Sequence, residues 1–244
     1  MPIFSLIILS GLAALMSSIF GIAGGVFLLA GLSMIAAPAS IIPMHAAVQT
    51  FGGIVRLAVF RRHLNFKIIK YFYIWMFLGA IIGSILLYII HSINPSFLLI
   101  IIGLFIVYSS VSIGRSNRKI AIRKISTLGI ICGALGLFVG STGPMVSIWL
   151  LDNGVVKEEH IACKSAIGIG LHALKIPIFI FLLDFDFSLY IIPILIMCSS
   201  VLVFSVVGKS IIKKFDDSKF IIIVKLLLFA IGINIIMKEL LGLL

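Results

Sequence analysis

The sequence predicts an all-α protein that crosses a membrane several times and consists of two inverted repeats. Of its 244 residues, 62% are hydrophobic and only 11% are charged, and the mean hydropathy is +1.32. A soluble domain carries about a quarter charged residues, and its single core could not bury this much apolar surface. The apolar residues also form runs, and a helix that spans a bilayer needs about 20 of them. We therefore expect about 8–10 membrane segments.

Ten apolar runs follow one another, and in lipid each must be helical because its backbone polar groups have no water to bind. The runs cover residues 3–23, 25–37, 44–60, 67–90, 94–113, 125–140, 143–151, 160–183, 188–208 and 219–243. The runs 25–37 and 143–151 are too short to span, and each follows a break that contains glycine. We predict a broken helix or a re-entrant hairpin at both places. No basic region precedes the first run, so we expect a retained membrane segment there and no cleaved signal peptide.

The order of these features occurs twice along the chain. The matching segments are Gly11 to Gly25 with Gly129 to Gly143, and His45 to Thr50 with His160 to Ser165. The simplest account is a duplication, with residues 1–114 as the first transmembrane repeat and residues 125–244 as the second. The basic stretch 115–124 would join them as a cytoplasmic linker. Internal repeats of this length are typical of membrane transporters.

The charges between the runs predict that the two repeats are inverted. The loop at 61–70 carries four Lys or Arg residues, whereas its equivalent at 184–187 carries two Asp residues. The next loop, 91–95, has no Lys or Arg, whereas its equivalent at 209–219 has four Lys residues. Basic loops stay on the cytoplasmic side. We therefore expect loops 61–70, 115–124 and 209–219 inside, in a multi-pass protein of the cytoplasmic (inner) membrane.

Two predicted helices, 44–60 and 160–183, carry polar side chains at helical spacing, with glycines between them. Ionisable groups inside a membrane are functional candidates by default. The candidate binding residues here are His45, Gln49, Thr50, Arg56, His160, Lys164, Ser165, His172 and Lys175. For Arg56 and for the two histidines that begin these helices, an interfacial position is an equal alternative. The amide and hydroxyl groups could serve helix packing alone.

Two lysines of the second helix are harder to place at an interface. Lys164 and Lys175 lie eleven residues apart, which is about 16 Å along a helix. Both cannot reach the same interface, so we expect at least one of them in a polar cavity.

The glycine breaks supply a second kind of donor. Where a helix restarts inside a membrane, its first N–H groups are unpaired and its dipole favours negative charge. The candidate residues at the breaks are Gly24, Gly25, Ser141, Thr142 and Gly143. The alternative is that these glycines only allow helices to pack closely.

The distribution of charge favours an anionic ligand. The first acidic residue is Asp152, so the whole first half lacks Asp and Glu. Cation sites and carboxylate proton relays use acidic residues inside the membrane. If protons are coupled, histidine is the expected carrier. The net charge is +11, but most of the basic residues lie in short breaks between the apolar runs. This placement argues against binding of nucleic acid. The three cysteines have no metal-ligand spacing, and we expect no metal and no cofactor.

The chain resembles the TauE/SafE sulfite/sulfonate exporter family. The matching residues are the run Phe20 to Gly25, the segment His45 to Thr50 and their second-half counterparts. The resemblance implies a membrane permease for small organic or inorganic anions, often containing sulfur, with the lipid bilayer around it. One difference lies at Gly140 to Pro144, where the family often has more glycines. Here Ser141 and Thr142 add hydroxyl donors.

Three function classes follow from these observations. The first is a secondary transporter that exports sulfite, a sulfonate or a related sulfur compound. An anion channel uses the same features, and the sequence does not separate the two. A membrane enzyme is disfavoured because neither H-E-x-x-H nor G-x-S-x-G occurs. The sequence leaves a homo-oligomer open.

Overall fold

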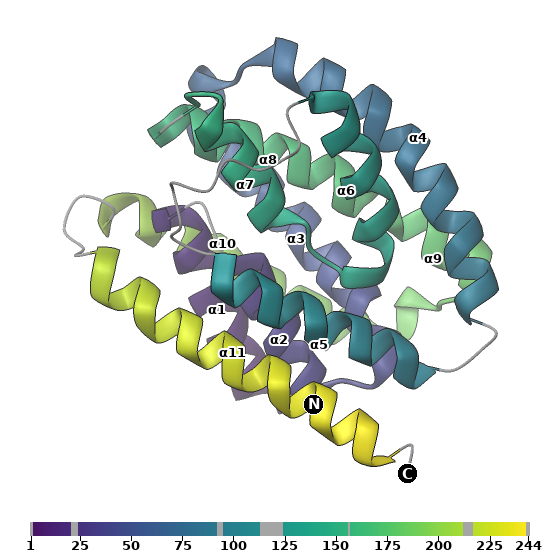
Figure 1. Cartoon of the computed structure of the whole chain (residues 1–244). Helices are drawn as coiled ribbons and strands as arrows, with labels where there is room; N and C mark the ends of the chain where they lie inside the picture. Colours follow the sequence, from purple (N-terminus) through teal and green to yellow (C-terminus); the bar gives the residue numbers. More distant parts are fainter. Residues whose placement is uncertain are drawn as a thin grey trace.

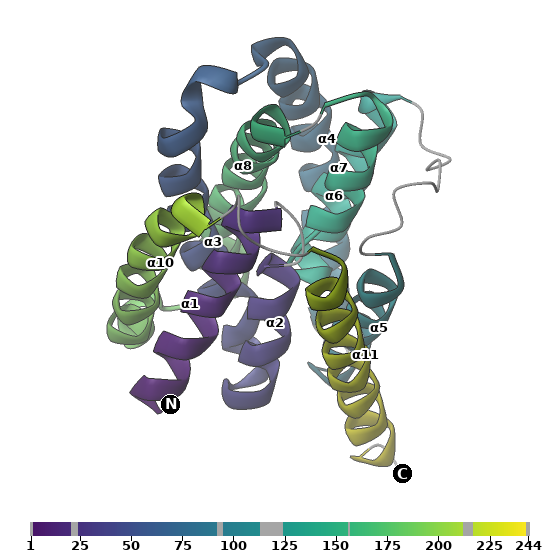
Figure 2. The ribbon, with the colours of Figure 1, turned by 90° about the vertical axis from the view of Figure 1, so that its left-hand side faces the viewer.

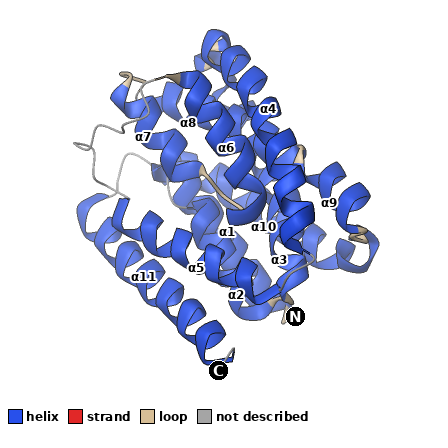
Figure 3. Cartoon of the chain, turned by 45° about the vertical axis from the view of Figure 1, so that its right-hand side comes forward, coloured by secondary structure: helices blue, strands red, loops and turns tan. Residues whose placement is uncertain are grey.

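A computed structural model of the chain describes residues 2–20, 24–91, 95–112, 124–155, 157–211 and 217–242. The α-helices are α1 (Ile3–Phe20), α2 (Gly24–Ile35), α3 (Pro38–Phe60), α4 (Phe66–His91), α5 (Pro95–Ser112), α6 (Ile125–Val139), α7 (Gly143–Asp152), α8 (Lys157–Ala173), α9 (Lys175–Leu183), α10 (Ile191–Ile211) and α11 (Asp217–Gly242). Two 3-10 turns are η1 (Arg61–His63) and η2 (Phe187–Tyr190). Over the described ranges the chain consists of helices joined by short loops and turns, and it contains no strand (Figure 3).

The fold class is that of a multi-pass membrane protein, as predicted. In the described part of the chain, three helical stretches are long and apolar enough to cross a membrane: Phe66–Ile89, Glu158–Leu183 and Phe187–Gly208. Shorter apolar helices cover Ile3–Ile19, Gly24–Ile35, Leu99–Val111 and Ile125–Val139. Large apolar side chains line the outer faces of α4 and α10, for example Ile85, 59% exposed, and Ile192, 67% exposed. Lipid is the solvent that suits such faces.

One predicted helix start was wrong, and one predicted run has the expected range but is interrupted by a turn. The helix predicted at 44–60 begins at Pro38, so His45 lies two turns inside α3 and not at its start. The run predicted at 160–183 is divided at Leu174 into α8 and α9. Pro177 explains the division, because a proline ring has no N–H and clashes with the carbonyl four residues earlier, here that of Ala173.

The first glycine break produces an antiparallel hairpin of α1 and α2, which lie side by side in Figure 2. Gly24 packs against the backbone of α1: a Cβ atom there would lie well under 3.0 Å from the carbonyl oxygen of Ala13. Gly31, two turns later, packs against Leu9. The short helix α2 therefore starts inside the protein, as the sequence predicts for this break.

The second break lies between α6 and α7. Gly140 adopts a positive φ of 72°, a conformation that favours glycine, and the chain changes direction there. Pro144 then occupies the first turn of α7, where a missing N–H is tolerated. The helix α7 is only ten residues long. It too begins inside the protein.

The closest helix pairs each join one helix of the first half to one helix of the second half (Figures 1 and 2). Helix α1 runs parallel to α10: Gly11 faces Phe204, and Gly208 faces Ser18. Helix α4 runs parallel to α6, and glycines again form the contact, with Gly133 against the backbone of α4. The repeat relates α1 to α6 and α10 to α4, so these are two copies of one contact.

Two further pairs join each helix to its own repeat equivalent. Helix α3 packs antiparallel to α8, and α5 packs antiparallel to α11, where Gly103 faces Ile236 and Gly232 faces Val107. Equivalent helices that run in opposite directions are what inverted repeats require, and this agrees with the inversion predicted from the charges. The division at 115–124 stays a prediction, since most of that stretch lies outside the described residues.

Candidate functional site

The centre of the molecule is the crossing of α3 and α8, the two helices with polar stripes. Gly53 makes the crossing close, because a Cβ atom there would lie 2.8 Å from Ile169 Cγ1 and 3.4 Å from the carbonyl oxygen of Ser165. Gly52 and Gly168 have no side chains, so they leave space beside this crossing. The polar residues of α3 and α8 therefore face one another across a narrow space and not toward lipid.

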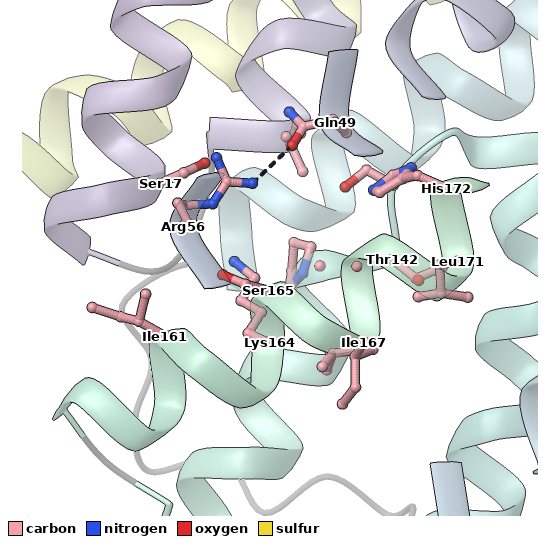
Figure 4. A pocket seen from close by; sticks show the side chains of 17 residues that line it. Ser17, Gln49, Arg56, Thr142, Ile161, Lys164, Ser165, Ile167, Leu171 and His172 are labelled. Carbon is pink, nitrogen blue, oxygen red and sulfur yellow. Dashed lines mark hydrogen bonds between the residues drawn. The ribbon is translucent and has the colours of Figure 1, made fainter. Parts of the chain in front are cut away.

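A cavity of about 50 Å³ lies at this crossing. A buried water needs about 10–15 Å³ on this measure, so the cavity has room for about three to five waters. Its lining comes from α1, α2, α3, α7, α8 and the link between α6 and α7 (Figure 4). The lining residues are Ser17, Gly25, Val26, Gln49, Arg56, Ser141, Thr142, Gly143, Pro144, Val146, Ile161, Lys164, Ser165, Ile167, Gly168, Leu171 and His172.

Two cationic side chains line this cavity, one from each repeat. Arg56 extends from α3 and donates a hydrogen bond from Nη2 to Gln49 Oε1 at 3.3 Å (Figure 4). Lys164 extends from α8, at the position that the repeat aligns with Gln49. None of the described residues that line the cavity is acidic. The lining therefore attracts negative charge.

The N-terminal ends of the two short helices reach the same cavity. Gly25 lies in the first turn of α2, and a Cβ atom there would lie 3.0 Å from Ser141 Oγ and 3.5 Å from Gln49 Nε2. Gly143 begins α7, and a Cβ atom there would lie 3.5 Å from Ser141 Oγ and 3.5 Å from Lys164 Cε. Ser141 thus stands between the two helix ends.

A basic cluster, made of His45, His172 and Lys175, adjoins the cavity. Its side chains bind backbone carbonyl groups at both glycine breaks. Lys175 donates a hydrogen bond from Nζ to the carbonyl oxygen of Gly140 at 2.5 Å, at the C-terminal end of α6. The same Nζ lies 3.5 Å from His172 Nδ1. His45 Nε2 lies 2.8 Å from the carbonyl oxygen of Gly25, and its ring meets that of His172 edge-on at 5.2 Å. A cation at a helix C-terminus is favourable, which explains why the Lys175 ammonium is buried there.

Nine of the fourteen residues predicted for the binding site line the cavity. They are Gly25, Gln49, Arg56, Ser141, Thr142, Gly143, Lys164, Ser165 and His172. Arg56 lines the cavity, and the expectation that Lys164 or Lys175 lies in a polar cavity is met by Lys164. Sequence reasoning missed Ser17. The repeat comparison could not have found it, because its second-half equivalent is Leu135.

The other five predicted residues lie outside the lining. Gly24 packs on α1, and Thr50 donates its hydroxyl to the carbonyl of Ala46 in its own helix at 2.8 Å. His45 and Lys175 hold the two breaks. His160 is buried in the first turn of α8, and its Nε2 makes no hydrogen bond to a described residue. Glu158 and Glu159 belong to the same first turn of α8.

Comparison with known proteins agrees with this architecture. One family model, described as Sulfite exporter TauE/SafE, matches residues 6–235. Comparisons with curated proteins and with solved structures gave no match. The matched range includes both glycine breaks, all of α3 and α8, and every residue that lines the cavity. The chain therefore belongs to the TauE/SafE sulfite exporter family, a family of membrane permeases.

Proposed function

We propose that the protein is a secondary transporter that carries sulfite, a sulfonate or a related small sulfur anion out across the cytoplasmic membrane. The observation that carries this proposal is the cavity at the crossing of α3 and α8. Two cationic side chains and the N-terminal ends of two short helices meet there. The membership of a sulfite exporter family supports the sulfur-containing substrate.

The side chains of the cavity suit an oxyanion. The Arg56 guanidinium is a planar fork of N–H donors whose spacing matches the oxygens of a sulfite or sulfonate group. Lys164 adds a compact charge from the opposite helix. The described residues that line the cavity include no Asp or Glu, and its charged side chains are basic, so the lining favours an anion over a cation. The same charges would repel a metal cation.

The helix ends add fixed donors. The first N–H groups of α2 and α7 have no partner within their own helices, and each N-terminus carries about half a positive charge from the helix dipole. Ser141 and Thr142 add hydroxyl groups at the start of α7, and the Thr142 side chain also interacts with the thiol of Cys132. An oxyanion would satisfy these donors. Discontinuous helices aimed at an anion are a known device of transporters.

The cavity volume favours a compact ligand. Space for about three to five waters fits one sulfur atom with three oxygens. A sulfonate with an organic chain would require the cavity to widen. We therefore expect sulfite to bind this state more tightly than taurine or sulfoacetate.

The pairing of the helices suggests how the anion would cross. The site lies between the two repeats, and α3 and α8 carry most of its side chains. Rocking of one repeat against the other around this point would expose the anion first to the cytoplasm and then to the outside. The alternative is an anion channel that uses the same residues. A carrier differs from a channel in showing saturable counterflow.

Thermal stabilisation of the purified protein tests the binding claim. The panel contains sulfite, thiosulfate, taurine, sulfoacetate, sulfate, acetate and chloride. A ligand present at 100 times its dissociation constant should stabilise the folded protein by about 2.7 kcal/mol. We expect a shift with sulfur oxyanions that is lost in Lys164→Gln.

Lys70→Gln is the matched control, because it removes the same charge from an exposed position on α4, away from the cavity. It should keep the shift. An unchanged shift in Lys164→Gln would remove Lys164 from the binding site. No shift with any anion would contradict an anion-binding cavity, and neutral and cationic solutes would be tested next.

A further inference from the structure

His172 links the cavity to the basic cluster behind it. Its ring lines the cavity on one side, and on the other its Nδ1 lies 3.5 Å from Lys175 Nζ. One proton fits between these two nitrogens: either the Lys175 ammonium donates to Nδ1, or a protonated Nδ1 donates to the neutral amine of Lys175. The pair thus shares protons between two nitrogens at a position that an anion in the cavity would adjoin. Among the described residues, His172 is the one imidazole in the lining.

Every charged group that faces His172 is basic. His45 and Arg56 approach it from α3, Lys164 lies on its own helix, and Lys175 approaches from α9. On the neighbouring helices, Tyr73 of α4, whose hydroxyl donates to the Ala166 carbonyl of α8, and Cys132 of α6 are neutral near pH 7. An additional proton in this surrounding is therefore opposed by several positive charges while the cavity holds only water.

An anion in the cavity reverses this balance. Its negative charge would lie beside His172, Arg56 and Lys164 and would offset part of this repulsion, so another proton on the cluster would cost less free energy. Such coupling is reciprocal: if the anion promotes protonation, protonation raises the affinity for the anion by the same factor. Histidine is the side chain whose protonation changes near neutral pH.

We infer that the His172–Lys175 pair is the proton site of this protein, and that it takes up one proton as the anion enters the cavity, so that anion and proton move together. This inference rests on the proposed function. It adds the coupling ion and the side chains that carry it. No carboxylate is required, which fits a described cavity lining without Asp or Glu.

The first experiment measures anion affinity across pH. Sulfate and thiosulfate are the main probes because their charge is constant between about pH 5.5 and pH 8.5; sulfite is added with its own titration measured in a blank. Uptake of one proton predicts that affinity rises as pH falls, by up to about tenfold per pH unit. In His172→Gln the slope should disappear, whatever affinity remains. His160→Gln, a buried histidine of the same helix outside the cavity, should keep the wild-type slope.

The second experiment uses only the wild-type protein and so does not depend on the folding of a variant. Addition of the anion to protein in weak buffer should remove close to one proton per bound anion, read with a pH-sensitive dye. Binding without pH dependence, or a His172→Gln variant with the wild-type slope, would overturn the proton site and leave the anion site standing. Absence of binding by all three anions at every pH would overturn both.

Discussion

Gly24 and Gly25 are neighbours in the first turn of α2, but they face different parts of the molecule, so alanine should act differently at each. At Gly24 a Cβ atom would lie well under 3.0 Å from the Ala13 carbonyl oxygen and from Ser17 Oγ. A backbone carbonyl cannot rotate away, so α1 and α2 would have to separate. Overpacking of this kind costs about 1–3 kcal/mol and occasionally more, and we expect at least about 3 kcal/mol here.

At Gly25 the added methyl group would point into the cavity. Its nearest neighbour would be Ser141 Oγ at 3.0 Å, a hydroxyl that can rotate, and the backbone of Gly25 does not require a positive φ. The change in stability should stay within about 1 kcal/mol. A methyl group is about as large as a water molecule, so it would remove about a fifth to a third of the cavity. It would also cover the first N–H groups of α2. We expect at least about a tenfold loss of anion affinity, equivalent to about 1.4 kcal/mol.

The assay compares Gly24→Ala and Gly25→Ala by thermal unfolding in detergent, with and without the anion that stabilises the wild type. The reasoning requires a low unfolding temperature for Gly24→Ala. Gly25→Ala should unfold near the wild-type temperature but respond weakly to the anion. Equal stability of the two variants would refute the packing of α2 on α1. Wild-type affinity in Gly25→Ala would refute a binding site at the start of α2.

Three further predictions follow from the packing and the charges. Lys175→Met should lower stability by about 1–3 kcal/mol, because it leaves the buried carbonyl at the α6–α7 break without its donor, and a lower unfolding temperature would report it. Gly133→Ala should cost more than about 2 kcal/mol of stability, because its Cβ atom would meet the backbone of α4. Gly136→Ala should change stability little, because the nearest neighbour of its Cβ atom would be 3.7 Å away. Equal unfolding temperatures of the two variants would contradict the contact between α4 and α6. Single cysteines in place of His63 and Asp186, both exposed, should react with an impermeant maleimide from the cytoplasm and from the outside respectively, and labelling from one side would contradict the predicted inversion.

The fold class was readable from the sequence because lipid leaves few choices. A chain with so few charges and so many apolar runs must form membrane helices, and glycine breaks mark where those helices stop. The helix boundaries near prolines were harder to predict from the sequence. Pro38 and Pro43 both lie within α3, which begins earlier than its apolar run suggests. Pro177 divides the long second-half helix, although its apolar composition continues across the break.

The site could be predicted in part. Helical spacing on α3 and α8 identified Gln49, Arg56 and Lys164, since each repeat carries its polar residues on one face. The sequence does not say which side of that face meets the cavity and which holds the backbone of a neighbouring helix. That depends on the exchange of helices between halves, such as α1 against α10. His45 and Lys175 bind the carbonyl oxygens of Gly25 and Gly140 at the two breaks. Helical spacing alone does not distinguish them from the residues that line the cavity.

Counterflow in liposomes tests the central claim most directly. Purified protein is reconstituted into vesicles loaded with unlabelled sulfite, and entry of radiolabelled sulfite is followed for wild type, Lys164→Gln and Lys70→Gln. We predict saturable entry that internal sulfite accelerates, in wild type and Lys70→Gln alike, and entry near the protein-free rate in Lys164→Gln. Equal flux in Lys164→Gln and wild type, or flux that never saturates, would contradict a carrier that binds its anion between α3 and α8.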